Sequence, residues 1–181
     1  MIIIGIGNVL QKDDGFGVYA STYLKQNYKY SQDLSIVNGG VEGINLYNYL
    51  IENEHVLILD ILNIDDKPAS IYAIPAQEIA GYGINNGGAH EIGIIQCLDM
   101  LEMQGKDIPQ TMLIGIVPGE VTFDFSLSEE LKNAFEDYIS VVLQYLKKHE
   151  IIATKKEEIT SLQEIIDRAK DPSGAMDLHV I

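Results

Sequence analysis

The 181-residue chain is poor in cysteine and in basic side chains, and each shortage excludes a class of protein. A single cysteine, Cys97, leaves no internal disulfide and no zinc site built on cysteines. Because Cys97 lies in an apolar helical pattern, we interpret it as a small buried hydrophobic side chain. Twelve Lys and Arg accompany 27 Asp and Glu, which gives a net charge of −15. This balance argues against binding to nucleic acid or to acidic membranes, since no basic patch can release counterions.

Long hydrophobic runs are also lacking. No stretch of the chain approaches the roughly 20 apolar residues that a membrane span needs. The apolar first residues lack the basic segment of a signal peptide, and glycines and carboxylates follow them too early. We therefore expect a cytoplasmic protein without membrane insertion. A hydrophobic content of 46% over 181 residues is enough for one domain with a substantial core.

What the sequence does contain is an alternation of apolar strands and amphipathic helices, followed by a polar end. Strands that are continuously apolar predict an α/β fold with a mostly parallel sheet. We expect one domain over residues 1–149 and a C-terminal extension with a short helix over residues 150–181. The predicted strands cover residues 1–6, 34–37, 55–60, 71–74 and 112–117, and the main predicted helices cover residues 18–28, 43–52, the segment from 90 onward, and 128–148.

The first predicted strand is followed by a glycine-bounded turn that holds two adjacent carboxylates, Asp13 and Asp14. In an open parallel sheet this turn lies at the carboxyl ends of the strands, where ligand sites form. Capping of the next helix would account for one of the carboxylates but rarely for both. A dinucleotide site is disfavoured, because Leu10 stands in place of the third glycine and the carboxylates would repel a pyrophosphate.

Three potential metal ligands have corresponding places in the predicted topology. Asp14 lies in the first turn, Asp60 ends the most hydrophobic strand, and His90 opens a helix after a glycine-rich loop. Singly, each has another explanation, as a helix cap, a strand end or a hydrogen-bond donor, but their joint placement favours one site. Two carboxylates and an imidazole suit a divalent transition metal better than calcium or magnesium. The helical zinc-protease motif His-Glu-x-x-His is absent from the sequence, and no serine or cysteine nucleophile is evident.

Five segments carry a resemblance to a known family: residues 7–17, 38–40, 56–60, His90 with the apolar helix after it, and 115–118 with 125–128. In this order they resemble the [NiFe]-hydrogenase maturation endopeptidases. The resemblance covers residues 1–148 and implies a three-layer, phosphorylase/hydrolase-like α/β fold. It also implies removal of the C-terminal peptide from the nickel-loaded precursor of a hydrogenase large subunit. The implied roles are nickel contact for Asp14, Asp60 and His90, with the metal brought by the substrate.

One departure from the family concerns a position with an implied catalytic role beside Asp14. The family has Asp-Gly-Gly where this chain has Asn38, Gly39 and Gly40, the expected substrate loop. An asparagine keeps one acceptor oxygen but cannot act as a general base. Asn38 therefore either impairs catalysis or only shapes the loop. The first case leaves open a catalytically silent or self-inhibited relative that binds the precursor without cleaving it. A more distant alternative is a related α/β hydrolase with other substrates, such as a germination protease.

The end of the chain resembles the end of a substrate. The resemblance implies precursors in which Asp-Pro-Cys-x-x-Cys-x-x-His precedes the cleaved bond. Here Asp171 and Pro172 are followed by Ser173, Met176 and His179, so both cysteine positions are changed. A hydroxyl and a neutral thioether cannot bind nickel as thiolates do. The tail is therefore either a terminus without a role or a tethered pseudosubstrate.

Overall fold

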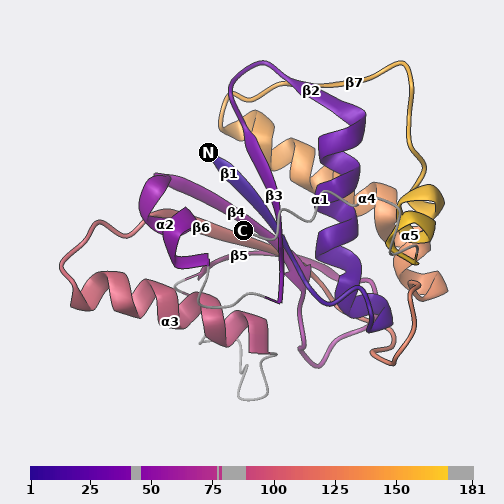
Figure 1. Ribbon diagram of the computed structural model, residues 1–181, viewed down its shortest axis with the longest axis horizontal. Coiled ribbons are helices and arrows are strands. Elements are labelled where there is room, and N and C mark those ends of the chain that lie inside the picture. Colours follow the sequence, from indigo (N-terminus) through magenta and orange to yellow (C-terminus); the bar gives the residue numbers. More distant parts are fainter. Residues whose placement is uncertain (42–45, 77, 79–88, 171–181) are drawn as a thin grey trace.

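A five-stranded sheet forms the centre of the protein (Figure 1). The computed structural model describes residues 1–41, 46–76, 78 and 89–170, with only the backbone for residues 89–93 and 95. The strand order is β3-β1-β4-β6-β5. All strands are parallel except the edge strand β5, which is antiparallel to β6. The expected mostly parallel sheet is thus confirmed. Its strands are β1 Ile2–Ile6, β3 Ser35–Gly40, β4 His55–Ile61, β5 Ile71–Pro75 and β6 Gln110–Ile116.

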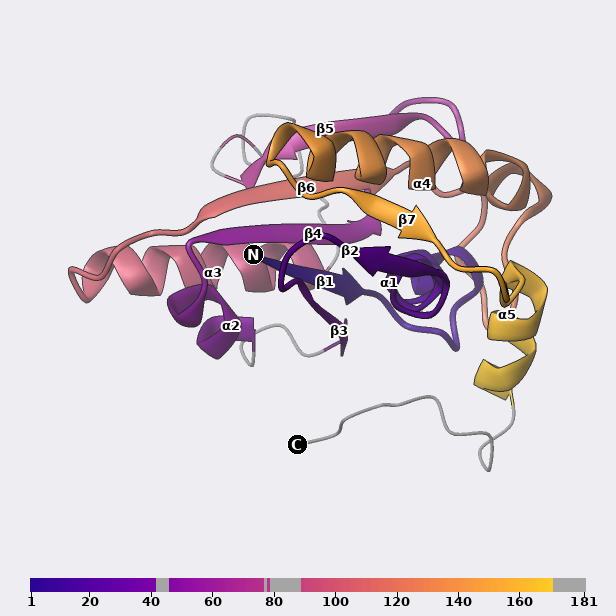
Figure 2. The ribbon, with the colours of Figure 1, turned by 90° about the horizontal axis from the view of Figure 1, so that it is seen from above.

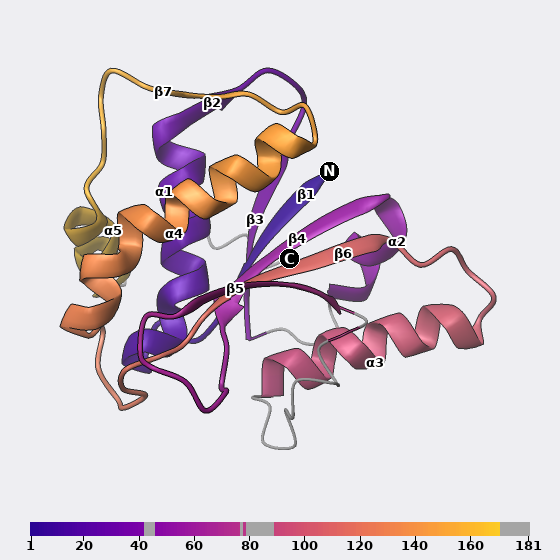
Figure 3. The same cartoon turned by 180° about the vertical axis from the view of Figure 1, so that it is seen from behind.

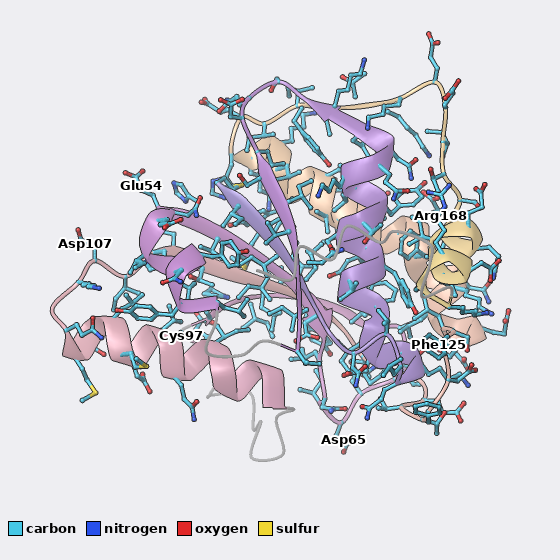
Figure 4. All side chains as sticks on the ribbon, in the orientation of Figure 1. Glu54, Asp65, Cys97, Asp107, Phe125 and Arg168 are labelled. Atoms are coloured by element: carbon cyan, nitrogen blue, oxygen red, sulfur yellow. The ribbon has the colours of Figure 1, made fainter. Side chains whose placement is uncertain are left out.

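Helices cover both faces of this sheet and make three layers (Figures 1 and 3). One face packs against α1 (Phe16–Asn27) and α4 (Glu129–Lys148), and the other against α2 (Tyr47–Glu52) and α3 (Ala89–Met103). Cys97 of α3 is fully buried between that helix and the sheet (Figure 4), as the sequence predicts. Burial raises the pKa of its thiol, which disfavours a nucleophilic thiolate.

The first strand and the first helix pack unusually closely. A Cβ added at Gly17 of α1 would lie 2.1 Å from the carbonyl oxygen of Leu59 in β4. A Cβ added at Gly5 of β1 would lie 2.1 Å from the hydroxyl of Ser21. Because only glycine fits at these contacts, they set the distance between the start of α1 and the ends of β1 and β4.

The end of β3 differs from the prediction. The sequence predicts a strand that stops before Asn38, whereas β3 continues through Gly40. Pairing with β1 carries it on, since Gly5 is opposite Asn38 and Ile6 is opposite Gly40 across a bulge. The backbone N–H of Gly7 then donates to the carbonyl of Gly40 at 2.9 Å. Gly40 has φ +51, a conformation that favours glycine at this position.

Residues 150–170 pack onto the body of the protein, whereas the sequence predicts an appendage. Strand β7 (Ala153–Lys155) pairs antiparallel with β2 (Tyr28–Tyr30), and α5 (Leu162–Lys170) lies beside α1 (Figure 2). The side chain of the buried Asn27 binds this segment through both atoms of its amide, to the carbonyl and the N–H of Thr160. The predicted extra helix is thus confirmed, while residues 150–170 add to the core through Ile151, Ile165 and Ile166.

Along the part of the chain that the structure describes, none of the helices combines the length and the apolar character that crossing a membrane requires.

Candidate active site

Asp14 and Asp60 lie at the carboxyl ends of two neighbouring strands. Asp14 is in η1 (Lys12–Gly15), the 3₁₀ turn between β1 and α1, and Asp60 is the penultimate residue of β4. The strands β1 and β4 pair with Gly5 opposite Leu59, and residues of η1 lie within 8 Å of residues of β4, Cα to Cα. The topology that the sequence predicts therefore brings these two acidic residues to the same edge of the sheet.

Both carboxylates are buried and hydrogen-bonded to backbone. Oδ2 of Asp14 accepts the N–H of Asn8 at 3.0 Å, and Oδ1 of Asp60 accepts the N–H of Ile61 at 2.8 Å. Asp14 is 8% exposed and Asp60 is not exposed. Two buried acidic residues at one edge of a sheet are typical of functional sites, where burial and neighbouring charges adjust the protonation of side chains.

The side chain of Asp60 is on the face of the sheet that α3 covers. Leu59 and Ile61 belong to the core under α1 and α4, whereas Val56 and Ile58 belong to the core under α2 and α3. Since side chains alternate along a strand, Asp60 shares the face of Ile58. The Asp60 charge also acts across the sheet on Tyr138 of α4. Burial is the main cause that raises the pKa of Tyr138, and the Asp60 carboxylate raises it further.

Asp13, the neighbour of Asp14, has a structural role. Its fully buried carboxylate accepts three backbone N–H groups, from Gly119 and Glu120 at 2.8 Å each and from Ser128 at 2.6 Å. Ser128 is the residue that caps α4, so Asp13 connects the first turn to the loop after β6 and to the start of that helix. One carboxylate of the pair is thus explained by backbone binding, though not as a cap of α1.

Asn38 points away from Asp60. Its Oδ1 accepts the hydroxyl of Ser21 at 2.6 Å, and its Nδ2 donates to the hydroxyl of Thr22 at 3.2 Å. Both partners belong to α1, on the opposite face of the sheet from Asp60. The structure therefore brings Asp14 and Asp60 together at the sheet edge but does not bring the Asn38 amide to Asp60. Gly39 and Gly40 form the last two residues of β3 beside β1.

The remaining predicted residues are placed only in part. His90 is the second residue of α3, a helix that runs antiparallel to β6, so its backbone lies toward the carboxyl edge (Figure 2). The side chain of His90 and all of Asp171, Pro172 and His179 lie outside the described part of the structure. Where side chains are described, no group of three His, Cys, Asp or Glu is arranged to hold a metal ion. Of the three residues of the predicted triad, the structure thus brings Asp14 and Asp60 to one edge of the sheet.

Two loops close over the edge next to Asp14. Lys12 forms an ion pair with Glu120, and its backbone N–H donates to the carbonyl of Asp124 at 2.7 Å. The hydrogen bond between the two side chains raises the pKa of Lys12 and lowers that of Glu120. The sequence alone does not reveal this connection, because Lys12 and Glu120 are 108 positions apart.

Fold and site together define an α/β protein of the hydrolase type with a buried acidic pair at the carboxyl edge of its sheet. A family profile for hydrogenase maturation proteases, HycI, matches residues 18–145. The chain belongs to the hydrogenase maturation protease family and is a peptidase of hydrogenase maturation. The family that the sequence resembles is thus confirmed.

Curated relatives and solved structures agree with this assignment. The chain is 26% identical over 180 residues to the hydrogenase expression/formation protein HupD of Thiocapsa roseopersicina, which covers 98% of this chain and 79% of that one. It is 24% identical over 160 residues to the hydrogenase 2 maturation protease of Escherichia coli, with 88% and 98% covered. The structure of the E. coli hydrogenase maturating endopeptidase HybD superposes with a TM-score of 0.78 at 23% identity, over 86% of this chain and 96% of that one. This last likeness confirms the α/β fold.

Proposed function

We propose that this peptidase removes the C-terminal peptide from the nickel-loaded precursor of a [NiFe]-hydrogenase large subunit, in the cytoplasm. The observation that carries the proposal is the buried pair Asp14 and Asp60 at the edge where β1 and β4 end. Asp13 holds three backbone N–H groups that join two loops, so we assign the chemistry to its neighbour Asp14 at the end of β1. Relatives named as maturation proteases favour cleavage over the catalytically silent alternative.

Nickel enters this proposal as part of the substrate. Asp14 and Asp60 supply carboxylate oxygens, and His90 at the start of α3 supplies an imidazole, a donor set that suits a divalent transition metal. The position of Asp60 on the face that α3 covers supports a joint role with His90. Within the site, a carboxylate such as Asp14 can take a proton from the attacking water.

Asn38 has a positioning role in this proposal. Its amide is engaged by the hydroxyls of Ser21 and Thr22 and fixes the end of β3 against α1. The strand end carries Gly39 and Gly40, and the carbonyl of Gly40 binds Gly7 near the turn of Asp14. Asn38 thus shapes the expected substrate loop, and the loss of a carboxylate at this position leaves the chemistry to Asp14.

The test is incubation of the purified chain with nickel-loaded and nickel-free precursor, followed by mass spectrometry of the precursor. We expect loss of the C-terminal peptide only from the nickel-loaded form. Asp14→Asn, Asp60→Asn and His90→Ala should each lower the rate by about 10²-fold or more, the scale of lost acid–base or electrostatic catalysis.

A matched control is Asp33→Asn, which removes an exposed carboxylate that precedes β3, at the opposite end of that strand from Gly39 and Gly40. Its rate should equal that of the unchanged protein. Equal cleavage of nickel-free precursor would refute recognition of the metal. Full activity of Asp14→Asn in a folded protein would refute the assignment of the site.

A further inference from the structure

An apolar groove opens beside the candidate active site. Its volume is about 530 Å³, and its walls come from several segments that are distant in sequence, Val18 of α1 among them. Val9 and Leu10 follow β1, Val41 follows β3, and Phe125 lies in the loop before α4. The last wall is the end of α5, with Ala169 and Lys170, and Figure 4 shows Phe125 on the same side of the molecule as that helix.

The groove is connected to the acidic site through its floor. Asn8 lines the groove, and its backbone N–H donates to Oδ2 of Asp14 at 3.0 Å. Gly7 and Gly40, which also line it, are joined by a backbone hydrogen bond and carry no side chain to fill it. A chain segment lying in the groove would therefore pass directly beside the turn that holds Asp14.

Several apolar side chains around the groove are more exposed than a closed surface would leave them. Val41 is 59% exposed and Leu10 is 40% exposed. Contiguous exposed apolar side chains at a rim are typical of a docking surface. The chemistry of this groove suits an extended segment with apolar side chains.

We propose that the occupant is the end of this same chain, residues 171–181. The segment follows Lys170, which itself lines the groove, so it starts where the groove is. At up to about 3.3–3.6 Å per extended residue, it is long enough to cross the groove and pass the turn of Asp14. Its second half is rich in the apolar side chains that the groove accepts, namely Met176, Leu178, Val180 and Ile181.

Helix α5, to which residues 171–181 are attached, is held firmly against the protein. Ile165 and Ile166 of α5 are buried in the main core, so the exit point at Lys170 is held against the groove. Tethering through a short segment gives an effective concentration on the order of millimolar, so even a weak contact is populated. Resting on the proposed function, one consequence is competition: the docked tail occupies the path by which a substrate segment reaches Asp14.

The experiment measures hydrogen exchange of groove amides in the full chain, without substrate. The backbone N–H groups of residues 8–10 and 41 should exchange about tenfold faster in Leu178→Asp than in the unchanged protein, since a tethered contact of moderate affinity is lost. Ile159→Asp is the matched control, because it adds the same charge to a 41% exposed apolar side chain of the C-terminal segment away from the groove. It should leave these amides unchanged.

A second measurement approaches the contact from the groove. Val41→Asp alters an exposed side chain, so the fold is expected to persist, and it should speed digestion of the tail by a carboxypeptidase. A peptide of residues 171–181, added to Leu178→Asp, should restore slow exchange. Protection that rises with protein concentration would place the tail in a neighbouring copy and overturn docking within one chain. Equal exchange and equal digestion in all variants would overturn the proposal, whatever the outcome with the precursor.

Discussion

The variant Asp13→Asn should be less stable than the unchanged protein. The neighbouring change Asp14→Asn should instead chiefly lower the rate of cleavage. Oδ2 of Asp13 accepts two backbone N–H groups, from Gly119 and Glu120, and Oδ1 accepts that of Ser128. An asparagine has one acceptor oxygen, and its amide nitrogen donates. If the oxygen keeps the two bonds in the loop, the nitrogen must face the N–H of Ser128, so two donors oppose each other in a buried place.

The magnitude follows from these contacts. A hydrogen bond to a charged group contributes about 1.5–3 kcal/mol, and a buried donor left without an acceptor costs about 1–3 kcal/mol. We therefore expect Asp13→Asn to lower the free energy of unfolding by about 3–5 kcal/mol. With a urea m-value of about 2 kcal/mol/M, the midpoint of unfolding should fall by about 2 M.

The assay is urea unfolding followed by circular dichroism, with cleavage of nickel-loaded precursor measured on the same samples. Asp14→Asn is the paired variant and should shift the midpoint by less than about 1 M, because Asp13 makes the contacts with the loop of Gly119 and Glu120. An unchanged midpoint in Asp13→Asn would refute the structural role. A larger shift in Asp14→Asn than in Asp13→Asn would reverse the two assignments.

Three further predictions concern other parts of the fold. Asn38→Asp should leave the cleavage rate and its pH profile unchanged, since the side chain faces hydroxyls of α1; a higher rate would restore a catalytic role for this position. Gly17→Ala should destabilise the protein by about 1–3 kcal/mol or more in thermal unfolding, because its Cβ would lie 2.1 Å from the carbonyl of Leu59; an unchanged melting temperature would contradict this packing argument. Burial and, secondarily, His55 lower the pKa of His149 from 6.5, so the folded state binds fewer protons than the unfolded state and stability falls as the pH drops below about 6.5. His149→Gln should flatten the melting temperature between about pH 5 and 7, and an equal slope in both proteins would exclude this histidine as the cause.

The positions of Asp14 and Asp60 could be predicted because they depend only on strand order and direction. Once the apolar runs are assigned as parallel strands, the residues that follow them must gather at one edge. The cap of α4 at Ser128 is similarly local, since its side chain accepts the N–H of Leu131 three positions further along the chain. Patterns that are local or that repeat along an element are readable from one sequence.

The role of Asp13 and the direction of Asn38 depend on contacts that no local pattern records. The three backbone groups that Asp13 binds lie between 106 and 115 positions further along the chain. The side of the sheet to which Asn38 points depends on the strand continuing past it, which pairing with β1 decides. A shift of one residue would have reversed the face.

The packing of residues 150–170 could not be predicted from the sequence, for a different reason. Strand β7 is short and mostly exposed, so it has no apolar alternation to mark it. Its partner β2 follows directly on α1, where the helical pattern simply continues into Tyr28. The buried Asn27 joins the two segments through Thr160, and an isolated polar residue at a helix end predicts solvent exposure more readily than this contact.

The glycine Gly17 contributes both to the stability of the fold and to the position of Asp14 relative to Asp60. Gly17 lets the start of α1 rest on the carbonyl oxygens of Leu59 and Ile6, so the turn that holds Asp14 is pressed against the strand that holds Asp60. A side chain at Gly17 would push these elements apart and displace Asp14 while leaving every acidic group present. Loss of cleavage in Gly17→Ala should therefore accompany loss of stability, whereas in Asp14→Asn the two should separate. Comparing Gly17→Ala with Asp14→Asn therefore tests whether cleavage needs only the carboxylates or also the distance between Asp14 and Asp60 that the backbone sets.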